Sequence, residues 1–243
     1  MIEPARSFDR AADEYERARA SYPSALLDAV PVAADAEVLD LAAGTGKLTR
    51  VLTQRYRRVI AVEPLGGMRA ILERVVPDAE ALAGSAEAIP LADESVDAVF
   101  VAQAFHWFAN DAALGEIARV LRPGGILCLV WNEHDDERES PLPAAYVERI
   151  AELHASALQA VRAAPPWSEV IARGPFGDVR ELAVAHDHVL DRAGVLDNAR
   201  STSWIARRPD DDREAIMGEL GALLNGGVFA IPNRANAMWT VRT

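Results

Sequence analysis

Short apolar segments recur along the first half of the chain, with helical periodicity between them. Those with the length and composition of strands are residues 37–42, 58–62, 79–83, 97–102 and 126–132. Strands that alternate with helices are typical of a parallel sheet covered on both faces. The pattern therefore predicts an α/β fold: a doubly wound, Rossmann-like, mostly parallel sheet whose ligand lies at the carboxyl ends of the strands.

The pattern changes after residue 133. An acidic loop, a long helix near 143–162 and a proline-rich stretch predict a helical insertion over about 133–177 that covers the site. Residues 179–189 alternate as a strand, 197–206 and 211–224 have helical spacing, and 236–242 predict a last strand. These strands fit an antiparallel C-terminal edge of the sheet. We expect one domain over residues 1–243.

The N-terminus, to about residue 30, is predicted to form a helical lid. In residues 7–20, Phe8, Ala12, Tyr15 and Arg19 share one face of an amphipathic helix. Either this helix closes over the site and offers a hydroxyl and a guanidinium to a carboxylate, or Tyr15 is a core residue beside a solvated Arg19.

A glycine turn follows the first predicted strand. Asp40 precedes Gly44 and Gly46 in a D-x-x-x-G-x-G frame. In a parallel sheet such a turn allows backbone N–H groups to approach a nucleoside cofactor. A dinucleotide fingerprint requires Gly or Ala at position 49, where Thr49 stands. The spacing therefore points away from NAD and toward S-adenosylmethionine (SAM), which has no pyrophosphate to bind.

The second predicted strand runs into an acid, Glu63. A carboxylate at this place can accept hydrogen bonds from both ribose hydroxyls of a nucleoside. The turn and the acid occur together at the separation that such a site requires. We therefore expect a cofactor site here, rather than an ordinary turn with a surface acid.

Composition narrows the class of partner. The 243 residues carry a formal net charge of −12, whereas phosphate binding depends on clustered Lys and Arg. We therefore expect a small-molecule substrate, and neither a nucleic acid nor a membrane. The single cysteine, Cys128, lies in an apolar run and is expected in the core. One cysteine forms no internal disulfide, which suits a reducing cytoplasm. We expect a monomer or a homodimer.

Several motifs point to one family. They are Phe8-Asp9 with Tyr15 and Arg19-Ala20-Ser21-Tyr22-Pro23, Glu63-Pro64 with Met68, Gly84-Ser85-Ala86-Glu87-Ala88-Ile89-Pro90, Gln103-Ala104-Phe105-His106-Trp107-Phe108, Trp131-Asn132 and Arg200-Ser201-Thr202-Ser203-Trp204. With the glycine turn, the chain resembles over nearly its whole length the class I SAM-dependent methyltransferases, in the small-molecule branch that includes trans-aconitate methyltransferase. Ala42 replaces the first glycine of the usual turn, and its methyl group is tolerated if φ there is negative.

The resemblance implies a cofactor site. It assigns the contacts with SAM to Asp40, Ala42, Gly44, Gly46, Glu63, Met68, Ser85, Ala86, Gln103, Tyr15 and Arg19. Ser85 and Ala86 flank the adenine in this interpretation; otherwise they form a plain polar turn. Gln103 ends the fourth strand and faces the methyl group of SAM, where a metal-dependent site needs an acid. We therefore expect no metal.

His106 is the candidate for a catalytic role. Its ordinary pKa near neutrality suits a general base, and the residue is equally suited to shaping the pocket. Trp107, Phe108 and Trp131 are candidates for the substrate pocket, although packing is the more common role of aromatic side chains. His186 and His188 share one face of a strand, without a third metal ligand nearby in sequence.

These observations predict a SAM-dependent methyltransferase that acts on a small organic molecule, with O-methylation of a hydroxyl or a carboxylate favoured. The alternatives are N- or C-methylation, another SAM-dependent reaction, a catalytically silent SAM-binding protein, and a nicotinamide reductase.

Overall fold

The computed structural model describes Glu16 and residues 18–158 and 166–243. The chain divides into two compact units. We call the described residues of Ser21–Glu133, Pro165–Val184 and Arg234–Thr243 the sheet unit. The described residues of Met1–Ala20, His134–Ala164 and Ala185–Asn233 form the helical unit.

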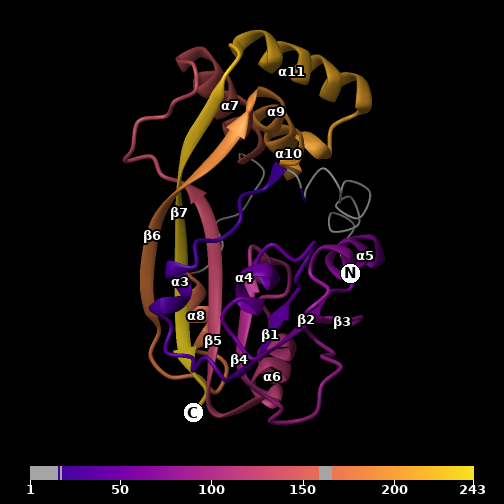
Figure 1. Ribbon diagram of the computed structural model, residues 1–243, viewed down its shortest axis with the longest axis vertical. Helices are drawn as coiled ribbons and strands as arrows, with labels where there is room; N and C mark the ends of the chain where they lie inside the picture. The colour runs from indigo at the N-terminus through magenta and orange to yellow at the C-terminus, as the bar shows by residue number, and fades with distance from the viewer. Residues whose placement is uncertain (1–15, 17, 159–165) are drawn as a thin grey trace. The chain divides into compact units, whose positions relative to one another are not determined.

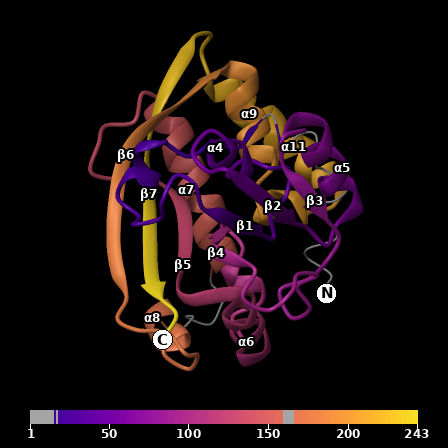
Figure 2. The same ribbon diagram turned by 60° about the horizontal axis from the view of Figure 1, so that its bottom comes forward.

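The sheet has seven strands in the order β3-β2-β1-β4-β5-β7-β6, as Figures 1 and 2 show. The strands are β1 (Glu37–Leu41), β2 (Arg58–Val62), β3 (Glu80–Leu82), β4 (Val96–Ala102), β5 (Leu121–His134), β6 (Arg180–Asp191) and β7 (Val228–Val241). β1 pairs in parallel with β2 and β4, β2 with β3, and β4 with β5. β7 runs against its neighbours β5 and β6 (Figure 1). The predicted fold class, with its antiparallel edge, is confirmed.

The last strands are longer than the sequence pattern predicts. The pattern places strands at 126–132 and 236–242, whereas β5 begins at Leu121 and β7 at Val228. Near its start β5 passes through Gly124, whose φ is +77°. Backbone bonds then join this turn to the C-terminus: the Gly124 N–H donates to the Arg242 carbonyl, and the Arg242 N–H donates to the Gly125 carbonyl at 2.8 Å. Pairing with a distant segment therefore extends β5 through a turn.

Helices belong to both units. The sheet unit contains α3 (Ala25–Asp28), α4 (Thr49–Thr53), α5 (Gly66–Val75), the 3-10 helix η1 (Phe105–Trp107), α6 (Asp111–Val120) and α8 (Trp167–Ile171); the helical unit contains α7 (Ala144–Leu158), α9 (Arg192–Arg200), α10 (Ser203–Ala206) and α11 (Asp210–Leu223). The helix predicted over 197–206 is thus two helices. The predicted insertion at 133–177 is divided as well, because α7 belongs to the helical unit and α8 to the sheet unit.

The sheet unit has a hydrophobic layer on each face of the sheet. Successive side chains of a strand point to opposite faces, so Leu39 packs with α6 and α8 while Val38 packs with α3 and α4. Cys128 is fully buried in the second layer, which confirms it as a core residue. Helix α6 begins where the Asn110 side chain accepts the Ala113 N–H at 3.0 Å, a typical N-cap.

The helical unit has a core of its own. Its buried side chains come from α7, α9, α10 and α11 and from the ends of β6 and β7. The predicted N-terminal helix lies mostly outside the described residues. Of its proposed contact residues, Arg19 is described, and its Nη2 donates to the Ser201 carbonyl at 2.9 Å. Within the described ranges, no helix combines the length and the apolar composition needed to cross a bilayer.

Candidate active site

The glycine turn after β1 is built on left-handed backbone. φ is +59° at Ala42, +60° at Gly44 and +89° at Gly46. Glycine adopts such angles readily, whereas the Cβ of an L-residue costs about 1–2 kcal/mol. The condition for an unstrained methyl group at Ala42, a negative φ, is therefore not met. The protein carries a strained alanine at this turn.

The two glycines of the turn are needed for different reasons. A Cβ on Gly46 would lie 3.0 Å from Cγ2 of Val76 and 3.2 Å from Cγ of Leu72, so Gly46 permits close packing of the turn against the end of α5. A Cβ on Gly44 would lie 3.8 Å from Sδ of Met68, an ordinary contact. At Gly44 the requirement is the positive φ.

Glu63 joins the turn to the next helix. Its Oε2 accepts the Gly44 N–H and its Oε1 accepts the Leu65 N–H, each at 2.8 Å. The residue is 3% exposed. A carboxylate has about four acceptor sites, so these bonds are compatible with additional hydroxyl donors from a ligand. The sequence-predicted acid therefore lies beside the sequence-predicted turn.

Asp40 is fully buried on β1, as is Thr49 at the start of α4. The Thr49 hydroxyl donates to Oδ2 of Asp40 at 2.6 Å. Oδ1 of Asp40 is buried without a hydrogen-bond partner in the structure. Burial raises the pKa of Asp40 to about 7, against the opposing effect of the Thr49 hydroxyl. An unsatisfied buried oxygen at this position suits a ligand that brings a polar or cationic group.

Sequence reasoning missed the role of Thr49. Its presence where a dinucleotide site has Gly or Ala served only to exclude NAD. A signal was available in the sequence: a hydroxyl residue begins the helix that comes after the acid of the first strand, where it can bond to that acid.

The loop after β3 is held in place by α6. Ser85 and Ala86 lie in this loop, and Ala86 is 5% exposed. Arg119 donates to the Ile89 carbonyl at 3.0 Å, and Glu116 accepts the Ile89 N–H at 3.0 Å. Arg119 and Glu116 also bond to each other at 2.7 Å. An ion pair on α6 thus positions the loop that carries two of the candidate cofactor contacts.

Gln103 connects the carboxyl ends of β4 and β5. It follows β4 directly and has a φ of +54°. Its side-chain Nε2 donates to the Asn132 carbonyl at 2.7 Å, and its backbone N–H donates to the Val130 carbonyl at 2.9 Å. The Asn132 amide in turn donates to the Ser21 carbonyl at 3.0 Å. A second strained residue therefore lies at the carboxyl ends of the strands, with its side chain fixed.

His106 lies in η1, the short 3-10 helix that follows β4. The structure places the separate turn η1 between β4 and α6, which begins at Asp111. The His106 side chain is exposed, and its ring centroid lies 4.6 Å from that of Trp107. Partial burial lowers the pKa of His106. This direction favours the neutral imidazole, which can accept a proton.

The aromatic candidates have different surroundings. Phe108 is 7% exposed and packs edge to face on the buried Phe105, so it lies in the core rather than at a free surface. Trp107 and Trp131 are partly exposed. Trp131 stacks on Trp167 of α8, a residue that the sequence placed only in a loop-like stretch.

The remaining candidates belong to other parts of the chain. Tyr15 lies outside the described residues, and Arg19 belongs to the helical unit, where it contacts Ser201. His186 and His188 are partly buried on one face of β6. Over the described ranges, no group of three or more His, Cys, Asp or Glu side chains is placed to hold a metal ion.

Comparisons with known proteins agree with this geometry. A family model described as a methyltransferase domain matches residues 39–129, which include the glycine turn, Glu63 and His106. A Mycobacterium tuberculosis protein named as an uncharacterised methyltransferase is 39% identical over 218 residues, which cover 90% of this chain and 85% of that protein. The chain is a class I SAM-dependent methyltransferase.

Two further proteins are similar to this methyltransferase, one over most of the chain and one over a shorter segment. A solved structure of a candidate type II methyltransferase from Anaeromyxobacter dehalogenans has a TM-score of 0.58 and 26% identity, and the match covers 92% of this chain and 96% of that one. A malonyl-[acyl-carrier protein] O-methyltransferase of Methylococcus capsulatus is 43% identical over 98 residues, only 38% of this chain and 36% of that protein.

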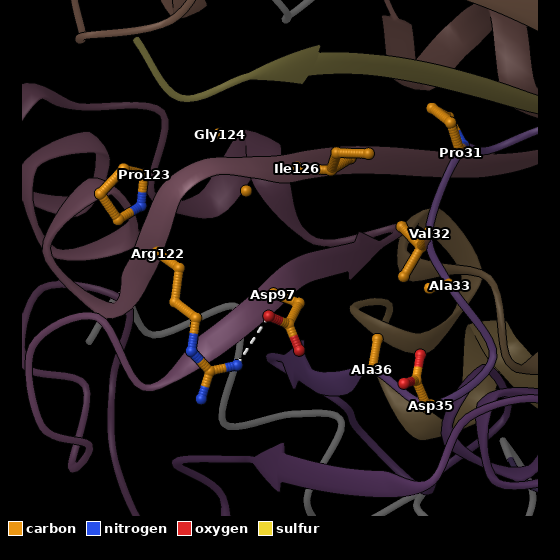
Figure 3. A pocket seen from close by; sticks show the side chains of 11 residues that line it. Pro31, Val32, Ala33, Asp35, Ala36, Asp97, Arg122, Pro123, Gly124 and Ile126 are labelled. Carbon is orange, nitrogen blue, oxygen red and sulfur yellow. Dashed lines mark hydrogen bonds and ion pairs between the residues drawn. The ribbon is translucent and has the colours of Figure 1, made fainter.

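The methyltransferase also has a surface hollow of about 340 Å³ at the opposite edge of the sheet (Figure 3). Arg122 lines it and donates to Oδ1 of Asp97 at 2.7 Å and to Oε2 of Glu37 at 2.9 Å. The Arg122 hydrogen bond lowers the pKa of Glu37. Glu37 and Val96 begin β1 and β4, so this hollow lies at the amino ends of the strands. Arg122 and Asp97, which both line the hollow, stabilise each other and do not belong to the candidate active site.

Proposed function

We propose that this methyltransferase transfers the methyl group of SAM to an oxygen, a hydroxyl or a carboxylate, of a small organic molecule. The observation that carries the proposal is His106: an exposed imidazole with a lowered pKa that follows the carboxyl end of β4. A neutral imidazole can take the proton that a hydroxyl loses as it is methylated. Local similarity to a malonyl-[acyl-carrier protein] O-methyltransferase also favours oxygen as the acceptor atom.

The cofactor roles form part of this proposal. Asp40, with its unpartnered buried oxygen, and the turn at Gly44 hold the methionine part of SAM, and Glu63 accepts the ribose hydroxyls. Ser85 and Ala86 flank the adenine. Met68 packs beside the turn, since its Sδ lies near the position of a Cβ on Gly44. Bound SAM supplies an electrophilic methyl group on a positively charged sulfur.

The main work of the protein is positioning. Gln103 is fixed by its bond to Asn132 at the edge where β4 and β5 end, and it presents no acid for a metal ion. Orientation of reacting groups at about 3 Å supplies several kcal/mol of a barrier. His106 is useful for a hydroxyl acceptor. A carboxylate acceptor is already ionised at neutral pH and needs no base.

The proposed class of methyl acceptor rests on the net charge of the protein and on the branch of the family that it resembles. A net charge of −12 disfavours a phosphate backbone as the acceptor, so the proposal names a small molecule and not a nucleic acid. The small-molecule branch that includes trans-aconitate methyltransferase is the part of the family to which we assign the chain. A monomer or homodimer in the cytoplasm completes the proposal.

Two measurements test the proposal. S-adenosylhomocysteine at a hundredfold excess over its dissociation constant should stabilise the protein by about 2.7 kcal/mol, seen as a higher melting temperature. Isotope-labelled SAM, incubated with separate pools of hydroxy acids, carboxylic acids and amines, should give labelled ethers or esters. If only the amines became labelled, the reaction would be N-methylation and the proposed O-methylation would be wrong. Cofactor binding without any labelled product would indicate a silent SAM-binding protein.

A further inference from the structure

Aromatic side chains from three separate segments meet in the sheet unit. The rings of Trp131 on β5 and Trp167 on α8 lie 6.0 Å apart between centroids, with an interplanar angle of 5°. The Trp167 ring meets the Phe105 ring at 5.5 Å and 81°. Stacked and edge-to-face arrangements of this kind are the favoured aromatic geometries. The residues form one packed group, which we call the aromatic wall: Phe105, Trp131 and Trp167.

The wall has a rigid base and a partly exposed front. Phe105 is fully buried, and the neighbouring Val170 and Ile171 of α8 are buried in the same core. Trp131 and Trp167 each keep part of their surface exposed. The buried side chains fix the orientation of Trp131 and Trp167, which remain partly exposed. These two side chains therefore lose little conformational entropy when an apolar ligand binds against them.

The wall lies at the edge of the sheet where the methyl transfer is proposed. β4 and β5 pair with Ala102 opposite Val130, so Trp131 is level with Gln103. Phe105 immediately precedes His106 in η1. The candidate base and the aromatic wall therefore flank the same carboxyl end of β4.

We infer that Trp167, together with Trp131, determines the specificity of the acceptor site, and that the acceptor carries an extended or flat apolar body in addition to its reactive oxygen. The inference rests on the proposed function and adds the chemical class of the substrate. Trp167 acts by contact with the apolar body and takes no part in proton transfer. Its removal should therefore change discrimination between acceptors and leave cofactor binding intact.

A series of ω-hydroxy acids with four to ten carbons tests this inference. Each member carries one hydroxyl and one carboxylate, so the series varies apolar length whichever oxygen reacts. Each methylene that becomes fully buried should raise kcat/KM by up to about fourfold. The wild-type protein should show this rise, and Trp167→Ala should flatten it. Trp167→Leu, which keeps an apolar side chain without the ring, carries the same test if the alanine variant does not fold.

Controls separate the inference from the proposed function. Trp239 is 7% exposed and packs on the opposite face of the sheet, so Trp239→Phe should keep the wild-type dependence on chain length. Calorimetry should give equal affinities for S-adenosylhomocysteine in all variants. If the wild-type protein did not bind S-adenosylhomocysteine, the proposed function itself would be wrong. With cofactor binding intact, a wild-type kcat/KM that is independent of chain length overturns the inference. Two other outcomes overturn it as well: an equal slope in the Trp167 variants, or ω-hydroxy acids that neither react nor bind to the cofactor-saturated protein.

Discussion

The Thr49 hydroxyl donates a hydrogen bond of 2.6 Å to Oδ2 of Asp40, and both residues are fully buried. This bond joins the middle of the sheet to the first turn of α4, across the glycine turn of the candidate cofactor site. It also opposes the effect of burial on the Asp40 carboxyl group.

Thr49→Val should destabilise the protein more at pH 8 than at pH 5.5. Hydrogen bonds to charged groups contribute about 1.5–3 kcal/mol, and bonds between neutral groups about 1 kcal/mol. Asp40, with a pKa of about 7, is mostly ionised at the higher pH. Urea unfolding at both pH values measures the difference. Thr49→Ser keeps the hydroxyl, so its free energy of unfolding should stay near the wild-type value. If Thr49→Val and Thr49→Ser lost equal stability, the effect would come from packing and not from the hydrogen bond.

Asp40→Asn should flatten the dependence of stability on pH. The pKa of about 7 in the folded protein lies above the ordinary value of about 3.9 in an unfolded chain. Between these values the folded state holds a proton that the unfolded state has released, so the free energy of unfolding falls as pH rises. Above pH 7 this contribution is constant. Urea titrations from pH 5.5 to pH 8 should show a smaller fall for Asp40→Asn than for wild type; parallel curves would contradict the raised pKa.

Ala42→Gly should stabilise the protein by about 0.5–1 kcal/mol. The substitution removes left-handed strain at a φ of +59°, and part of the gain is lost because glycine increases the entropy of the unfolded chain. Ala43→Gly is the matched control, since Ala43 is not among the described residues with positive φ, and it should destabilise. Thermal unfolding of both variants gives the comparison. Destabilisation by both would mean that the methyl group of Ala42 contributes packing that outweighs its strain.

Glu63→Gln should weaken binding of S-adenosylhomocysteine by about tenfold or more. The amide replaces one charged acceptor and places an NH₂ group against the Gly44 or the Leu65 N–H, both of which now donate to the carboxylate. Calorimetry measures the affinity. Glu73→Gln on α5, the helix that follows Glu63, alters a partly exposed ion pair with Arg69 at 3.9 Å, and the affinity of this variant should not change. Similar affinities for both variants would place Glu63 outside the cofactor site.

The role of His106 distinguishes the two kinds of oxygen acceptor that we propose. For a hydroxyl acceptor, His106→Ala should slow the chemical step by about a hundredfold or more. Partial burial lowers the pKa of His106, so the wild-type rate should rise with pH through a value below the ordinary one and then level off. For a carboxylate acceptor, mainly the apparent affinity should change. Single-turnover rates from pH 5 to pH 9 distinguish these cases, and unchanged rates and profiles in His106→Ala and His106→Gln would show that the histidine has only a structural role.

The sequence by itself determined the parts of this protein that depend on local pattern. Strands β1, β2 and β4 lie within one residue of their predicted bounds. Each is a nearly continuous buried apolar run, and such a run with its flanking turn residues is a property of neighbouring positions. The glycine turn and Glu63 were also identified from spacing alone, since the carboxyl ends of neighbouring parallel strands meet at one edge of the sheet.

Only the tertiary structure decided the rest. The positive φ of Ala42 is imposed by the turn between β1 and α4, against the preference of alanine itself. Trp167 meets Trp131 although 35 positions separate them, and β5 is extended by pairing with Arg242 at the far end of the chain. Such contacts join residues that are distant in sequence, where hydrophobic periodicity and turn chemistry carry no information about which partners will meet.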